Sequence, residues 1–306
     1  MEETEGPKDG NNLADMIMAK MNAGDFIDGD KMDNGSSMPD SSLDPKVIAA
    51  YRKVSIVMRS FKSGKLPKAF KIIPQTQNWE ELLLLTDPSK WSAHSSFEAT
   101  KIFSSQLNSK MAQRFYNVIL LPNVQANIFT YKKLNYHLYM AVKKAMFKTG
   151  AFFKGFLLPL AETASTREAI IIGSILQKMS IPGLDVAAAL VKMTTGEYKL
   201  GNGYFIKVLI SKRYTLPTMV LDSLINYFCK IGMAEHEQDM EDEDIEEEED
   251  VLPTEMPVMW HQTVLALVQC YKTYFTPQQR KKIKALIKVQ HHYAITPEIQ
   301  RELANS

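Results

Sequence analysis

Apolar residues recur at helical spacing along the chain from residue 46 onward. The first such segment has four of them three or four positions apart, namely Val47, Tyr51, Val54 and Met58. This spacing places them on one face of an α-helix, and similar runs follow between short breaks that carry glycine or proline. No segment keeps the two-residue alternation of a half-buried strand. The pattern therefore predicts an all-α fold, a stack of helices of about 10–20 residues joined by short turns.

Several residues indicate where these helices begin. Ser95 is followed three positions later by Glu98, and Ser165 is followed in the same way by Glu168. A serine and a glutamate at this spacing are typical of a capping box, so each serine predicts a helix start. Residues 201–203, with the sequence GNG, predict a turn before the next helix.

The first 45 residues carry a different pattern, rich in glycine, aspartate, serine and asparagine. They hold 11 acidic and 3 basic residues without a sustained apolar period, which predicts a disordered acidic tail. Residues 13–21 are the exception, because Leu13, Met16 and Ile17 follow helical spacing. They form either a short helix that folds onto a partner or a chance cluster of apolar residues. The remainder, residues 46–306, is then one helical domain.

A second acidic segment interrupts this domain. Residues 235–250 hold 12 acidic residues and no lysine or arginine. Carboxylates at this density repel one another, which predicts a disordered loop between two helices. Its role stays open between a plain solvated loop, a docking site for a basic protein and a competitor of RNA for the basic part of the chain.

Outside these two acidic segments the chain is strongly basic. The formal net charge of the whole chain is +1, but the remaining residues include 33 basic and 12 acidic ones, a net charge of +21. A body with this charge attracts polyanions through several ångströms of solvent, and RNA is the most common polyanion inside a cell. The charge favours contact with RNA or a ribonucleoprotein over a basic surface that serves solubility alone.

Three groups of basic residues are candidates for an RNA-binding surface. The first has a lysine at every third position across a segment that Gly64 and Pro67 interrupt: Lys62, Lys65, Lys68 and Lys71. In an extended polyproline-like path every third side chain falls on one side, so the four ammonium groups could follow a phosphate backbone. Phe61 and Phe70 flank the group, and their burial against the first helices is favoured over stacking on bases.

The second group lies on a long helix predicted over residues 124–147. The core stripe of this helix consists of Leu134, Leu138, Ala141 and Ala145. Eleven residues make about three helical turns, so Lys132 aligns with Lys143. Lys133 aligns with Lys144 in the same way, which gives two basic rows about 16 Å long, away from the stripe.

The third group shares a predicted helix with apolar residues on its other face, namely Ile283, Leu286 and Ile287. Its members are Arg280, Lys281, Lys284 and Lys288. One such group is usually a solvated helix face. Three of them in a body of charge +21 favour an RNA-binding surface.

The sequence carries no recognisable catalytic or metal-binding arrangement. The six histidines lack partners at metal-ligand spacing, and the 12 acids of the basic part offer few paired carboxylates. Cys229 and Cys270 each lie in an apolar helical pattern, which favours buried reduced thiols. No apolar run approaches the roughly 18 residues of a membrane span, and the N-terminus lacks a secretory pattern. We therefore expect a non-catalytic intracellular protein without a metal, a cofactor, a small-molecule substrate or a membrane.

Several short motifs along residues 46–306 closely resemble the bystin family. They are SGKLPKAFKIIP at 63–74, NWE at 78–80, MAQRFYN at 111–117, LLP at 120–122, LYMA at 138–141, KKA at 143–145, REAII at 167–171, WHQ at 260–262, PEI at 297–299 and REL at 301–303. Their number and order argue against a chance match.

The resemblance implies a HEAT-like helical-repeat α-solenoid without catalytic residues. It further implies a nuclear and nucleolar ribosome biogenesis factor that joins the precursor of the small ribosomal subunit, supports its assembly, RNA processing and export, and passes to the cytoplasm on pre-ribosomal particles. The implied partners are pre-ribosomal RNA, small-subunit ribosomal proteins and other assembly factors. The residues by themselves leave one alternative, a protein-only helical scaffold whose basic faces bind acidic partners.

Overall fold

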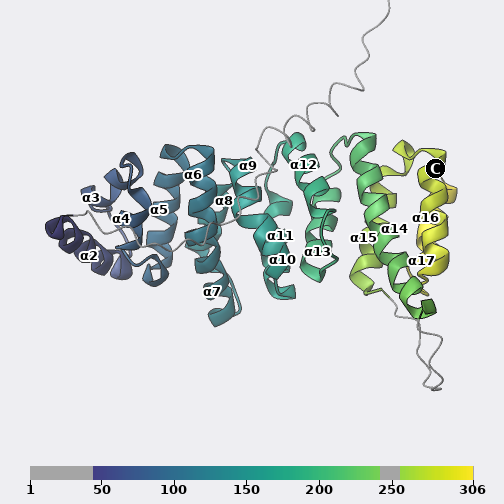
Figure 1. The fold of residues 1–306 in the computed structure, drawn as a ribbon, viewed down its shortest axis with the longest axis horizontal. Helices are drawn as coiled ribbons and strands as arrows, with labels where there is room; N and C mark the ends of the chain where they lie inside the picture. The colour runs from purple at the N-terminus through teal and green to yellow at the C-terminus, as the bar shows by residue number, and fades with distance from the viewer. Residues whose placement is uncertain (1–43, 242–255, 306) are drawn as a thin grey trace, which may run out of the picture. The chain divides into compact units, whose positions relative to one another are not determined.

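The computed structural model describes the backbone of residues 44–241 and 256–305 and the side chains of residues 44–233 and 256–305. Across this part of the chain every regular element is a helix (Figure 1), so the all-α prediction is confirmed. The predicted tail of residues 1–45, with its short helix at 13–21, lies outside the described residues except for its last two positions. Where the sequence pattern indicates one helical domain, the contacts divide the described chain into two compact units, residues 44–160 and residues 161–305.

The first unit packs its helices around a core of aromatic rings. Its helices are α2 (Pro45–Ser60), α3 (Lys68–Ile72), α4 (Trp79–Leu84), α5 (Ala93–Gln106), α6 (Ser109–Phe115), α7 (Leu121–Tyr131), α8 (Tyr136–Ala145) and α9 (Thr149–Phe152), with α10 (Leu158–Thr163) at the unit boundary. Short 3-10 helices lie between them at Ile73–Gln75 and Pro88–Lys90. Wider π-helical turns lie at Tyr116–Leu120 and Phe153–Leu157. The helix α5 packs along α8. The buried rings of Phe103 and Phe115 stack with their centroids 4.7 Å apart.

The second unit arranges its helices in two rows. Its helices are α11 (Thr166–Lys178), α12 (Gly183–Met193), α13 (Leu200–Ile210), α14 (Thr218–Glu241), α15 (Val258–Tyr271), α16 (Pro277–Val289) and α17 (Thr296–Ala304), with a 3-10 turn at Lys272–Tyr274. The helix α13 packs against α11 and α15, and α15 packs against α17. The helix α14 packs against α12 and α16. Odd-numbered helices therefore form one row and even-numbered helices the other.

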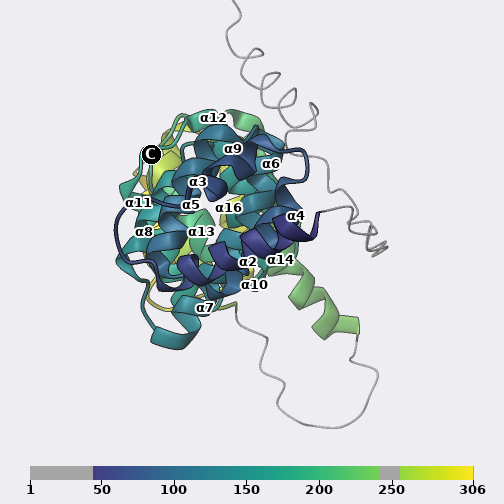
Figure 2. The ribbon, with the colours of Figure 1, turned by 90° about the vertical axis from the view of Figure 1, so that its left-hand side faces the viewer.

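The helix α14 continues into the acidic segment in which the sequence predicts a loop. Its backbone stays helical through residue 241, so the first seven residues of the predicted loop, 235–241, are helical. Figure 2 shows these last turns projecting from the rest of the unit. Glutamate, glutamine and methionine are strong helix formers, so charge repulsion does not end the helix where the acidic residues begin. Residues 242–255 lie outside the described chain.

Side chains at the helix starts explain where two helices begin. Ser165 and Glu168 bond each other's backbone N–H, so the predicted capping box of α11 is confirmed. The helix α5 begins at Ala93, because Ser92 Oγ accepts a hydrogen bond from the Ser95 N–H at 3.1 Å. The predicted cap at Ser95 is therefore wrong by three residues.

Two glycines that predict a turn lie inside α13 instead. A Cβ on Gly203 would lie 2.7 Å from the Tyr198 hydroxyl oxygen, and a Cβ on Gly201 would lie 3.1 Å from Ala164. Both contacts are tighter than side chains normally tolerate. The glycines therefore serve close packing, and the prediction of a turn is wrong.

A turn divides the long helix predicted over residues 124–147. Lys132 has a left-handed backbone with a φ of 57° and ends α7. Asn135 caps α8 by accepting a hydrogen bond from the His137 N–H at 2.9 Å. Asn127 Oδ1 in turn accepts a hydrogen bond from the Asn135 N–H at 3.0 Å. The prediction of a single helix over residues 124–147 is therefore wrong, and so is the prediction of two aligned rows of lysines.

Candidate nucleic-acid interface

The first predicted basic group lies on the connection between α2 and α3 and on α3 itself. Lys62 and Lys65 belong to the connection, and both are exposed. Lys68 and Lys71 are exposed one turn apart on α3. Gly64 has a φ of 98°, which a polyproline-like path does not contain. The predicted continuous extended path is therefore wrong, although all four lysine side chains reach solvent.

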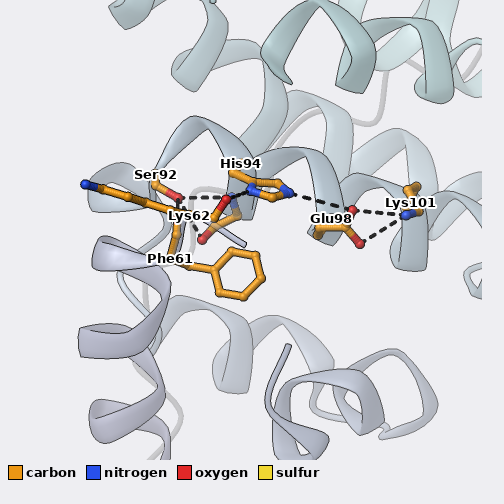
Figure 3. A network of polar contacts seen from close by, with 7 residues as sticks. Phe61, Lys62, Ser92, His94, Glu98 and Lys101 are labelled. Carbon is orange, nitrogen blue, oxygen red and sulfur yellow. Dashed lines mark hydrogen bonds and ion pairs between the residues drawn. The ribbon is translucent and has the colours of Figure 1, made fainter. Parts of the chain in front are cut away.

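A polar network holds the connection that carries Lys62 against the start of α5 (Figure 3). Ser92 Oγ donates a hydrogen bond to the Phe61 carbonyl oxygen at 2.6 Å, and His94 Nδ1 contacts the Lys62 carbonyl oxygen. The opposite nitrogen of His94 lies 4.0 Å from the Glu98 carboxylate. The backbone of the connection is thus fixed by α5, while its lysine side chains point to solvent.

Aromatic contacts extend this network to the core and to α8. Phe61 and Phe70 are both buried, which confirms their predicted place in the core. The His94 ring stacks on the ring of His137 in α8, with centroids 4.4 Å apart and planes 12° from parallel. The basic connection and α8 are therefore joined through α5.

The second predicted group lies at the two ends of α8. Lys132 and Lys133 are exposed in the turn before α8. Lys143 and Lys144 are half-buried in its last turn. Most of α8 therefore separates the two pairs along the chain. The structure separates these pairs, whereas the predicted rows align them.

Exposed aromatic rings accompany these lysines, and charge patterning alone missed them. Lys132 Nζ lies 4.7 Å from the ring centroid of Phe129, and Lys144 Nζ lies 5.0 Å from that of Phe147. Four rings of this region are between 64% and 77% exposed: Phe129, Tyr131, Tyr136 and Phe147. Large exposed apolar side chains that cluster are typical of interaction sites.

The same region has no acidic residues in its sequence. Between Glu98 and Glu162 the chain has nine lysines and arginines and no aspartate or glutamate. This interval is a second signal in the sequence, and the spacing of the three basic groups does not contain it. It predicts a surface on which positive charge is not neutralised locally.

The lysines around α8 differ from other basic residues of the interval in their partners. Arg114 Nε pairs with Glu80 at 2.7 Å. The Lys148 ammonium donates to the Leu107 carbonyl oxygen, and burial lowers the pKa of Lys148. Four others form no ion pair with a carboxylate in the described part of the chain: Lys132, Lys133, Lys143 and Lys144. Their charge is available to a polyanion.

The third predicted group lies on α16. The predicted apolar face is buried, and it consists of Ile283, Leu286 and Ile287. Lys281, Lys284 and Lys288 are exposed on the other side. Arg280 is half-buried, and its guanidinium donates to the Lys272 carbonyl oxygen at 3.1 Å. Arg280 therefore helps to anchor α16, and the three lysines form its exposed basic face.

The described residues contain no group of three or more histidine, cysteine, aspartate or glutamate side chains placed to hold a metal ion. Among the helices that the structure describes, none has the length and apolarity to cross a bilayer. Cys229 and Cys270 are free thiols, and each is half-buried, so the prediction of buried thiols holds only in part. Burial raises the pKa of Cys229, which keeps the thiol protonated and weakly nucleophilic at neutral pH.

Fold and surface together define an all-helical protein with a basic, aromatic-rich surface. The family model described as Bystin matches residues 7–306. The chain is 46% identical over 299 residues to Bystin of Monosiga brevicollis, with 96% of this chain and 66% of the relative covered. It is 44% identical over 296 residues to Bystin of Homo sapiens, with 96% and 64% covered. The chain belongs to the bystin family and spans about two thirds of the length of these relatives.

Proposed function

We propose that this protein is a non-catalytic assembly factor of the small ribosomal subunit that binds pre-ribosomal RNA and proteins of the subunit precursor. In this role it supports subunit assembly, processing of the ribosomal RNA and export. Membership of the bystin family supports the proposal, because the motifs of the sequence imply this role. The names of the family and of its relatives carry no enzymatic designation, which favours a binding role over catalysis.

The observation that carries the proposal is the unpaired positive charge around α7 and α8. The chain between Glu98 and Glu162 has no acidic residue, and four of its lysines lack a carboxylate partner among the described residues. Each lysine that contacts a phosphate releases a condensed counterion, which supplies much of the affinity for nucleic acid. The lysines of the three basic groups named above are the proposed RNA-binding residues, whereas Arg280 of the third group anchors α16.

The proposal includes a HEAT-like helical-repeat architecture. The two rows of α11 to α17 support it, because each helix packs on the second helix before and after it, as in a stack of helix pairs. Such a stack offers long surfaces to large partners. A scaffold of this kind needs no cofactor or small-molecule substrate.

The proposed protein partners are small-subunit ribosomal proteins and other assembly factors. Exposed apolar residues away from the basic groups, such as Ile170 on α11 and Val258 on α15, offer contact area for them. The proposed location is the nucleus and nucleolus, with passage to the cytoplasm on pre-ribosomal particles.

The salt dependence of RNA binding tests the proposal. Affinity for a fragment of small-subunit precursor RNA is measured between about 50 and 200 mM salt, and four phosphate contacts should give a logarithmic slope of about −3 to −4. Crosslinking to RNA in cells, followed by sequencing, should recover small-subunit precursor fragments. A chain that binds acidic polypeptides but neither binds nor crosslinks to RNA would instead be a protein-only scaffold.

A further inference from the structure

A groove opens beside the turn between α7 and α8. It has a volume of about 500 Å³ and lies between the start of α5, one face of α7 and the turn itself. Its lining combines hydroxyl and amide side chains with the exposed Tyr131 and Lys133, and none of the lining residues is acidic. Sites of about 300–1,000 Å³ hold ligands of small-molecule size, and one nucleotide falls in this class.

Two asparagines of α7 present hydrogen-bonding groups to the groove. Asn123 Nδ2 donates to the Pro88 carbonyl oxygen at 3.2 Å, and Asn127 Oδ1 accepts from the Asn135 N–H at 3.0 Å. These bonds fix the orientation of both amides. Within the described residues, Asn123 Oδ1 and Asn127 Nδ2 have no hydrogen-bond partner. Residues four apart on a helix are neighbours, so one acceptor and one donor lie on the same wall of the groove.

One exposed aromatic ring lines the groove, and two more are exposed on the same helical hairpin. Tyr131 lines it, and Phe129 and Tyr136 are exposed on either side of the turn. Lys132 lies over the Phe129 ring, so a positive charge accompanies the aromatic face. Every base has a flat apolar face, so an unpaired base can stack on an exposed aromatic side chain whatever its sequence.

This combination fits unpaired bases better than other ligands. A duplex hides its base faces in the stack and its pairing edges in hydrogen bonds. Its phosphates could contact the lysines, but its bases could contact neither the aromatic rings nor the asparagine amides. An apolar peptide would leave the asparagine groups of the groove without partners, which costs free energy. A single strand supplies phosphates, base faces and base edges together.

We infer that the groove binds single-stranded RNA, with one unpaired base in the groove, stacked on Tyr131 and bonded to Asn123 and Asn127, and with Lys133 at a phosphate. The inference rests on the proposed function and adds the form of RNA that this surface recognises. It assigns a base-recognition role to residues that charge alone does not single out.

The test compares the full-length chain with single variants in binding to a short oligouridine and to an RNA duplex of equal length. The wild-type chain should bind the oligouridine more tightly at equal salt. Tyr131→Ala should weaken oligouridine binding about tenfold and leave duplex binding unchanged, because only the single strand loses a stacking partner. Tyr131→Phe should restore the affinity, since the ring remains. Tyr274→Ala is the matched control, because Tyr274 is 61% exposed in the other unit.

Each outcome decides a different point, provided that melting temperatures match. Equal oligouridine binding by the wild type, Tyr131→Ala and Tyr274→Ala would overturn the inference and leave the proposed function standing. If Tyr131→Ala keeps oligouridine binding but loses a co-purifying small-subunit protein, the groove would be assigned to that protein, and the inference would again be overturned. A wild-type chain that binds neither RNA would overturn the proposed function itself. Ultraviolet crosslinking of oligouridine to Tyr131, located by mass spectrometry, would support the inference directly.

Discussion

The turn between α7 and α8 and the exposed face of α16 both carry several lysines, but different groups surround them. Around the turn, Lys132 lies over the exposed ring of Phe129, and the neighbouring sequence contains no acid. On α16, the side chain of Gln279 donates to the Asp222 carboxylate of α14 at 2.6 Å, so an acid accompanies the basic helix. Lysines on a solvated helix face attract phosphates without reading bases. The difference suggests that α16 contributes electrostatic attraction, whereas the turn adds a preference for unpaired bases.

The two regions also differ in the backbone that supports them. The helix α16 is continuous and begins with a capping box between Thr276 and Gln279. The turn depends on Lys132 in a left-handed conformation, which costs roughly 1 kcal/mol for a residue with a side chain. Asn127 and Asn135 hold the turn through their hydrogen bonds. The proposed base-recognition site is therefore built on a strained turn, and the phosphate-attracting face on a regular helix.

The largest expected effect comes from placing a charge in the core beneath each region. Leu138 on α8 is 3% exposed and Ile283 on α16 is 2% exposed. Leu138→Asp and Ile283→Asp each bury an unpaired carboxylate, so we expect each to lower the free energy of unfolding by about 3 kcal/mol or more. Denaturant unfolding followed by circular dichroism measures the change.

A variant at a half-buried position of the same helix controls for the added charge. Lys144→Asp should lower the free energy of unfolding by less than about 1 kcal/mol, because its carboxylate stays hydrated. An unchanged unfolding midpoint for Leu138→Asp would show that the core stripe of α8 is misassigned.

The core side of α8 follows from the sequence, whereas the turn before it does not. Leu138, Ala141 and Ala145 fit one helical stripe, and all three are buried. Leu134 fits the same stripe but lies in the turn, where it is half-buried. Lysine has no special preference for a left-handed backbone, so Lys132 gives no local signal that a helix ends. Tertiary contacts decide the break, and a periodic pattern does not contain them.

The candidate site, too, could be predicted from the sequence only in part. Repeated lysines and arginines identify the basic groups, because charge spacing is local. The pattern does not show that Arg280 bonds a backbone carbonyl or that the α8 lysines form two separate pairs. The groove joins Ser92 at the start of α5 with Asn127 on α7, residues 35 positions apart, so only the folded chain brings them together.

Charge reversal compares the two regions as phosphate-binding surfaces. The variants are Lys143→Glu with Lys144→Glu on α8 and, as the matched pair, Lys284→Glu with Lys288→Glu on α16. We expect each double variant to weaken RNA binding about tenfold or more at moderate salt, because each lost phosphate contact reduces the steepness of the salt dependence by about 0.7–0.9. Fluorescence anisotropy at several salt concentrations measures both quantities.

Both double variants should keep the wild-type melting temperature, because their lysines lie off the buried stripes of their helices. Normal association of the folded α8 variant with RNA or pre-ribosomes at moderate salt would remove this surface from the proposal. A loss confined to α16 would reverse the ranking of the two regions.

Removing a helix cap is expected to have a smaller effect on stability in both regions and to affect RNA binding in only one of them. Asn135 caps α8 and Thr276 caps α16, so Asn135→Ala and Thr276→Ala should each cost about 1 kcal/mol of unfolding free energy. Asn135 also lines the groove. We therefore expect Asn135→Ala to weaken oligouridine binding and Thr276→Ala to leave it unchanged. Equal effects of both changes on binding would indicate a general loss of stability instead of a local change in the groove.

The smallest expected effect concerns the acidic segment that follows α14. Replacing the eight acids of residues 242–250 with asparagine and glutamine, at constant length, raises the formal net charge from +1 to +9. Residues 235–241 stay unchanged, because α14 continues through them. If the segment competes with RNA, affinity should rise about threefold and the salt dependence should steepen, because more lysines exchange counterions for phosphate. The melting temperature should not change, because carboxylates at this density repel one another and their removal takes no stabilising contact away.

Combining this replacement with charge reversal tests which group of lysines the segment competes for. The segment continues from α14, and α14 packs against α16, so competition should act mainly on the α16 lysines. The gain in RNA affinity should then disappear in the Lys284→Glu, Lys288→Glu background and persist in the Lys143→Glu, Lys144→Glu background. A segment that docks a basic protein would leave RNA affinity unchanged in both backgrounds, while co-purification of that protein falls. Loss of helical content on replacement would contradict both roles, because it would make these carboxylates part of the fold.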